Sequence, residues 1–80
     1  MMEEGQVYQK LNAIFVDVFD DDALSVKAET TADDVDGWDS LSHIRLVLSV
    51  EKAFNVKFSA AEVGKLKNVG ELVGLIRSKL

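Results

Sequence analysis

The chain has 80 residues, of which 48% are hydrophobic, and its formal net charge is −5. This length predicts a single domain over residues 1–80, with enough hydrophobic residues to fold around one modest core. Because the chain has no cysteine, disulfides, zinc–thiolate sites and a cysteine nucleophile are excluded. The polar N-terminal stretch does not resemble a signal peptide, and no apolar run approaches the roughly 20 residues that span a bilayer. We therefore expect a cytoplasmic protein that does not insert into membranes.

The charge is unevenly distributed along the chain. Residues 17–39 carry nine acids and one lysine, a net charge of −8, whereas residues 40–80 carry seven bases and three acids, a net charge of +4. Because phosphates would be repelled by the acidic half, we expect no nucleic-acid partner. The acidic segment either attracts a partner protein with a basic patch or is simply a solvated loop.

The first predicted element is an amphipathic helix of about 14 residues. Its apolar residues recur at the spacing of one helix face: Val7, Tyr8, Leu11, Ile14, Phe15, Val18 and Phe19. Three consecutive aspartates, residues 20–22, end it. Residues 20–38 have only scattered apolar positions, so we predict a long ordered loop, and loops of this length are often functional.

A second helix is predicted from Ser40 to Phe54. Asp39 is a favourable N-cap residue, whose carboxylate would lie near the positive end of the helix dipole, and Asn55 is a suitable C-cap residue. Because most faces of this helix are apolar, we expect it to be central in the fold. Its polar residues share one narrow stripe: Ser42, Arg45, Ser49 and Lys52.

Two further helices are predicted by their N-terminal caps. Ser59 and Glu62 match the capping box and predict a short third helix that starts near Ala60. Asn68 and Glu71 have the same spacing and open a last helix. The apolar residues of this last helix lie on one side: Val69, Leu72, Val73, Ile76 and Leu80. No segment shows convincing strand alternation, so the fold class is all-α: a four-helix bundle with three longer helices, a short third helix and a long loop between the first two.

Ser40, at the start of the second helix, has several possible roles. Serine is common at this position, so it could serve the helix start alone. A hydrolase nucleophile would need a base, and the only histidine, His43, lacks a third group to orient it. We therefore expect no enzymatic activity, and we expect His43 to be a surface or boundary residue.

Metal binding and covalent attachment are the remaining possibilities. Residues 34–37 resemble the middle of an EF-hand loop, but Ala32 and His43 occupy the end positions that should be acidic, so we predict no metal site. A phosphodiester on Ser40 would lie at a helix N-terminus, where free backbone N–H groups favour phosphate. Such an attached group is the one way in which this chain could gain a thiol.

The motif Asp39-Ser40-Leu41, followed by the apolar run to Phe54, resembles the acyl carrier proteins. The resemblance covers nearly the whole chain, including its length, its acidic balance, the long loop, the capping box at Ser59 and the final helix. It implies an acyl carrier domain over residues 1–80 in which Ser40 carries 4′-phosphopantetheine, added from coenzyme A by a phosphopantetheinyl transferase. It further implies a monomer that carries acyl groups as thioesters between enzymes of fatty-acid, polyketide or related biosynthesis.

The resemblance also assigns roles to the neighbours of Ser40. Asp39 is expected to help engage the transferase and its metal ion, in addition to capping the helix. Leu41 is expected to contact partner enzymes or the arm, or to pack as an ordinary apolar residue. An apolar groove between the second and third helices is expected either to shield the acyl chain or to be plain core. Its expected residues are Ile44, Phe58, Val63 and Leu66.

Four residues depart from the pattern of the fatty-acid synthase carriers. Ser42 stands where an acid commonly follows the motif, and Arg45 and Lys52 make the polar stripe of the second helix basic, which weakens docking of enzymes with basic patches. Trp38 is reminiscent of discrete carriers in specialised pathways. We therefore favour a specialised carrier; the alternatives are an aminoacyl or peptidyl carrier and an unmodified helical interaction module.

Overall fold

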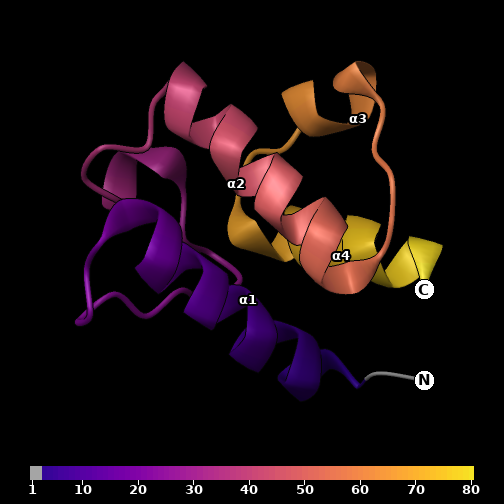
Figure 1. Cartoon of the computed structure of the whole chain (residues 1–80), viewed down its shortest axis with the longest axis horizontal. Coiled ribbons are helices and arrows are strands. Elements are labelled where there is room, and N and C mark those ends of the chain that lie inside the picture. The colour runs from indigo at the N-terminus through magenta and orange to yellow at the C-terminus, as the bar shows by residue number, and fades with distance from the viewer. Residues whose placement is uncertain (1–2) are drawn as a thin grey trace.

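The computed structural model describes residues 3–80, which form four α-helices and one short 3-10 helix (Figure 1). The helices are α1 (Glu4–Phe19), α2 (Ser40–Phe54), α3 (Ala60–Gly64) and α4 (Val69–Lys79), and the 3-10 helix is η1 (Ala32–Asp34). No strand occurs in this part of the chain. The predicted all-α class, with three longer helices and a short third one, is confirmed.

The helix ends are set by the side chains that the sequence predicts. The Asp39 carboxylate accepts the backbone N–H of Ser42, and the Ser59 and Asn68 side chains accept the N–H three residues further on. These bonds satisfy donors that a helix N-terminus leaves without a partner. Asn55 ends α2 in the left-handed conformation, as predicted, with φ of 56°. Helix α1 begins at Glu4, earlier than its apolar pattern indicates, because Glu3 and Gln6 form a further capping box.

The core lies between α1, α2 and α4. Each of these helices contributes a buried apolar stripe, whereas α3 contributes no buried residue. The segments between the helices add Val26, Val35 and Val56. The buried residues of the helices are Val7, Leu11 and Phe15 of α1; Leu46, Val50 and Phe54 of α2; and Val69, Leu72, Val73 and Ile76 of α4.

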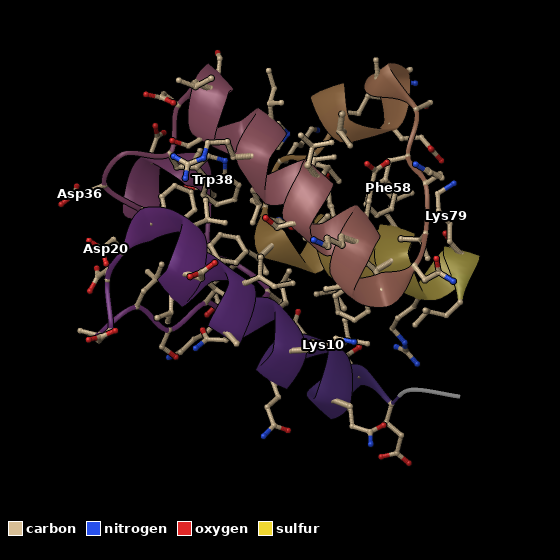
Figure 2. All side chains as sticks on the ribbon, in the orientation of Figure 1. Lys10, Asp20, Asp36, Trp38, Phe58 and Lys79 are labelled. Carbon is tan, nitrogen blue, oxygen red and sulfur yellow. The ribbon has the colours of Figure 1, made fainter. Side chains whose placement is uncertain are left out.

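The loop between α1 and α2 is fastened to the helices through its backbone. The Asn12 side chain accepts from the Val26 N–H at 2.8 Å and donates to the Leu24 carbonyl at 3.3 Å. At the start of α4, the N–H groups of residues 69 and 70 donate to the carbonyls of residues 30 and 28, both at 2.8 Å. The loop is therefore ordered, as predicted, although η1 within it was not predicted. Asp20 and Asp36 lie at its outer edge (Figure 2).

Helix α2 differs from its prediction in one respect. The helix is buried along one side only: on the other side, Leu41, Ile44 and Leu48 are 69%, 58% and 59% exposed. The short α3 leaves this side of α2 uncovered. Leu80 is also 49% exposed and follows the last residue of α4, so it does not belong to the buried stripe of that helix. Within residues 3–80, no helix combines the length and the apolar character needed to cross a membrane.

Candidate functional site

Ser40 is the first residue of α2 and is exposed. The residue before it, Asp39, fixes the helix start: its Oδ1 accepts the Ser42 N–H at 2.9 Å, and its carbonyl accepts the His43 N–H at 2.9 Å. The Ser40 hydroxyl makes no hydrogen bond to any other residue from 3 to 80. The side chain is thus held at a helix N-terminus with its oxygen open to a reagent from solution.

The approach to Ser40 is a tight turn. Gly37 has a φ of 85°, which glycine adopts without strain, and its carbonyl accepts the Ser42 hydroxyl at 2.7 Å. Ser42 therefore ties the turn to the first helical turn. The hydrogen bond from the backbone N–H of Ser42 lowers the pKa of Asp39, so its carboxylate stays charged beside the helix N-terminus.

His43 does not serve Ser40 as a base. Its Nδ1 accepts the Trp38 indole N–H at 3.1 Å, and its Nε2 lies 3.1 Å from the carbonyl oxygen of Val63. Both ring nitrogens are therefore occupied, and the geometry of a serine–histidine pair is absent from the described chain. As predicted, His43 is a boundary residue, half-buried between α2 and α3.

The partnership of Trp38 with His43 is the feature that the sequence interpretation missed. The tryptophan ring packs edge-on against Phe15 at 5.2 Å and tilted against Phe19 at 6.0 Å, measured between ring centroids. The one available signal was the position of an aromatic N–H donor five residues before the only histidine. This signal is weak, because residues five apart meet only when the turn between them is tight.

Acidic clustering does not produce a metal site in the described residues. Nowhere in residues 3–80 do three His, Cys, Asp or Glu side chains come together as metal ligands would. Asp34 of the EF-hand-like stretch instead closes η1, where its Oδ2 accepts the Thr31 N–H at 2.9 Å.

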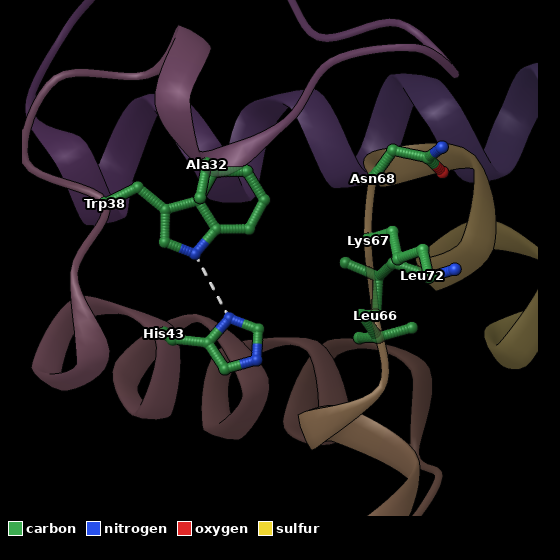
Figure 3. Close-up of a pocket in the computed structure, with 7 residues that line it drawn as sticks. All are labelled: Ala32, Trp38, His43, Leu66, Lys67, Asn68 and Leu72. Carbon is green, nitrogen blue, oxygen red and sulfur yellow. Dashed lines mark hydrogen bonds between the residues drawn. The ribbon is translucent and has the colours of Figure 1, made fainter.

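Three hollows share the side chain of His43, and one of them is lined by Ser40. An open hollow of about 500 Å³ at Ser40 is bordered by Trp38, His43 and Ile44. A groove of about 240 Å³ between α2 and α3 includes the predicted residues Ile44, Phe58 and Val63. Leu66, predicted for the same groove, instead lines an inner cavity of about 70 Å³ (Figure 3). The residues of this inner cavity are Ala32, Trp38, His43, Leu66, Lys67, Asn68 and Leu72.

These features fit a phosphodiester-linked arm on Ser40. The hydroxyl is free, the helix N-terminus favours a phosphate, and the adjoining hollow offers apolar surface to whatever the arm carries. Leu41, on the next position, presents its side chain to solvent and lines none of the three hollows.

Comparison with known proteins gives concordant results. Residues 9–76 match the family model described as phosphopantetheine attachment site. The chain is 34% identical over 73 residues to the acyl carrier protein of Streptococcus pneumoniae serotype 4, covering 91% of this chain and 95% of the relative. It is 31% identical over 80 residues to the acyl carrier protein of Thermotoga maritima, covering 100% and 99%. A solution NMR structure of a holo acyl carrier protein from Geobacter metallireducens superposes with a TM-score of 0.86 at 46% identity, covering 91% of this chain and 84% of that one.

Proposed function

The chain belongs to the acyl carrier protein family, whose prosthetic group is 4′-phosphopantetheine, and we propose that Ser40 is the residue that carries this group. The observation that carries the proposal is the Ser40 side chain itself. It is an exposed hydroxyl without a hydrogen-bond partner among residues 3–80, at the N-terminus of a 15-residue helix. We infer that residues 1–80 form one acyl carrier domain in which Ser40 is the attachment point.

The bound group supplies a terminal thiol on a flexible arm, on which an acyl group is held as a thioester. The residues of the chain provide the rest. The free N–H groups of the first turn of α2 stabilise a phosphate on Ser40, and the hollows beside it offer apolar surface to the arm and its acyl chain. Tethering raises the effective concentration of the acyl group for each partner enzyme in turn. The chain itself performs no catalysis.

The residues near Ser40 determine how enzymes approach and contact this serine. Asp39 stays ionised and holds the helix start in place while the phosphopantetheinyl transferase and its metal ion engage the serine. Leu41, with 69% of its surface exposed, contacts partner enzymes. Acidic residues of the loop attract enzymes with basic patches. Arg45 and Lys52, on the exposed side of α2, repel such patches and so reduce the range of enzymes that can dock. This charge pattern supports a specialised carrier, which acts as a monomer in the cytoplasm.

The experiment that tests the proposal is intact mass after incubation with coenzyme A, magnesium and a broad-specificity phosphopantetheinyl transferase. We expect the wild type to gain one phosphopantetheine and the Ser40→Ala variant to gain none. Ser25→Ala is the matched control, because Ser25 is an exposed loop serine, and it should be modified like the wild type. Circular dichroism verifies that both variants are folded. A gain in Ser40→Ala, or no gain in the wild type, would contradict the proposal.

A further inference from the structure

The inner cavity and the Ser40 hollow share three lining residues: Ala32, Trp38 and His43. Ala32 contributes only a methyl group, so the two large side chains at this junction are the rings of Trp38 and His43, and His43 also lines the groove between α2 and α3. Figure 3 shows the two rings on one side of the cavity, with residues 66–68 and Leu72 on the other. Any group that enters the cavity from Ser40 has to pass this pair.

The pair is fixed by hydrogen bonds at both ends. Since the indole N–H of Trp38 donates to Nδ1 of His43, the second nitrogen, Nε2, carries the proton and donates to the carbonyl of Val63. The loop before α2, the first turn of α2 and the end of α3 are thereby connected through one imidazole. The rings are nearly parallel, with an interplanar angle of 20°.

Packing against α1 holds the tryptophan in place. Its contacts with Phe15 and Phe19 leave it half-buried, and Phe15 is fully buried in the core. Moving the indole would therefore disturb the core as well as the hydrogen bond. Moving the imidazole would leave the indole N–H and the Val63 carbonyl without partners in a site that is partly shielded from water, which is unfavourable.

We propose that Trp38 and His43 determine which acyl groups this carrier takes inside, admitting short or hydroxylated acyl groups and keeping long saturated chains outside. The proposal rests on the attachment of the arm to Ser40. The cavity behind the pair is about 70 Å³, the volume of two or three water molecules at about 30 Å³ each, so it accepts only a few heavy atoms. A longer chain has to break both hydrogen bonds of His43. A hydroxyl group on the cargo can instead donate to or accept from the groups it displaces.

The test compares three cargoes on the same protein. A phosphopantetheinyl transferase transfers the acyl-phosphopantetheine group of acetyl-, 3-hydroxybutyryl- and octanoyl-coenzyme A to the Ser40 hydroxyl, with release of adenosine 3′,5′-bisphosphate, and intact mass verifies loading. Protection is measured as the rate of thioester cleavage by hydroxylamine relative to the corresponding free coenzyme A thioester. The indole N–H resonance of Trp38, the only tryptophan, reports whether its hydrogen bond persists. We expect acetyl and 3-hydroxybutyryl to be protected and octanoyl to be cleaved as fast as octanoyl-coenzyme A, with the indole resonance unchanged by octanoyl.

Variants of the pair make the comparison sharper. His43→Ala removes the barrier, and octanoyl protection should rise by about 10- to 100-fold, the size expected when two hydrogen bonds no longer have to be broken. Trp38→Phe keeps an aromatic ring but removes the N–H donor and part of the indole, and it leaves the bond between His43 and Val63 in place, so a smaller rise is expected. Ser49→Ala is the matched control, since Ser49 lies on the same helix and lines none of the three hollows, and it should behave like the wild type.

The outcomes separate this inference from the proposed function. Loading of all three cargoes on Ser40, with octanoyl protected in the wild type as strongly as 3-hydroxybutyryl, would overturn the inference alone. Unchanged protection in His43→Ala would do the same. Absence of any arm on Ser40 would overturn both proposals.

Discussion

Helices α3 and α4 begin with the same chemical signal but are held to the protein in different ways. Each has an N-cap side chain that accepts the N–H of a glutamate three residues on. Helix α4 then buries four apolar side chains, whereas α3 buries none. A cap therefore decides where a helix starts, and the side chains that follow decide how firmly it is anchored.

Polar contacts hold α3 where apolar contacts hold α4. The Val63 carbonyl lies against His43, and the Glu62 carboxylate pairs with the Lys79 ammonium at 3.2 Å. Just before α3, the Phe58 N–H donates to Glu51 at 2.8 Å. Water competes for such contacts, so each stabilises less than a buried side chain does. We infer that α3 opens locally at lower free energy than α4.

The largest expected difference between the two helices comes from truncating an apolar side chain. Ile76→Ala in α4 removes a side chain with 0% exposure, and we expect the free energy of unfolding to fall by about 2–5 kcal/mol. Val63→Ala in α3 removes a half-buried side chain and should lower it by about 1 kcal/mol or less. Urea unfolding measures both. Equal losses would show that α3 is anchored as firmly as α4.

A smaller effect is expected from glycine replacements within α4. A Cβ at Gly70 would lie 3.0 Å from the Ala28 carbonyl oxygen, which accepts the Gly70 N–H, so Gly70→Ala should cost about 1–2 kcal/mol. Gly74→Ala is its control. No atom lies within 4 Å of a Cβ there, and the substitution should stabilise by about 0.5–1 kcal/mol. Thermal unfolding of the two variants should therefore shift in opposite directions, and shifts of the same sign would contradict the close approach of the loop to α4.

Removing the caps sharpens the comparison further. Asn68→Ala should lower the global free energy of unfolding by about 1 kcal/mol, because α4 is part of the core. Ser59→Ala removes the same kind of hydrogen bond, but it should act mainly on the local opening of α3. Amide hydrogen exchange over residues 60–64 and global unfolding distinguish the two cases. Faster exchange in α3 with nearly unchanged global stability is the expected result for Ser59→Ala.

The smallest expected effect is a pH dependence confined to α3. The backbone N–H of Ser59, and after it Lys79, lower the pKa of Glu62 below its ordinary value of 4.5. A lowered pKa means that the stabilisation is complete above that value and is lost as the pH falls through the folded-state pKa. In Glu62→Gln, amide hydrogen exchange over residues 60–64 should therefore be faster than in the wild type at about pH 6, and the difference should shrink towards about pH 3. A difference independent of pH would contradict the role of the carboxylate.

The sequence predicts the helices of this protein well because their ends are local events. Asp39, Ser59 and Asn68 each satisfy a donor three residues away, and such short-range bonds can be inferred without knowing the rest of the fold. Burial is less local. Leu48 and Leu46 are equally apolar, but only Leu46 is buried, because the short α3 covers little of α2. The prediction of α2 as apolar on most sides could not specify which of those sides would find a neighbour.

At the candidate site too, local features can be predicted from the sequence and contacts between distant segments cannot. Asp39 and Ser40 follow from a motif of adjacent residues and from helix capping. The bond between Trp38 and His43 depends on how tightly the chain turns at Gly37, and the contact of His43 with Val63 depends on where α3 lies. The inner cavity, between residues that are distant in sequence, could only be found in three dimensions.

The fastening of the long loop through backbone atoms has a consequence for the evolution of this protein. The groups that hold the loop to α4 are the main-chain carbonyls of residues 28 and 30 and the N–H groups of residues 69 and 70, so the exposed side chains of the loop take no part in this attachment. Several acidic side chains of the loop are exposed and form no hydrogen bond within residues 3–80, among them Asp22, Glu29, Asp33 and Asp36. Mutation of these side chains can therefore change the charge of the loop surface while the fold is preserved. During evolution, a carrier with this fold could therefore change the enzymes it docks with through successive mutations, and every intermediate variant would still fold.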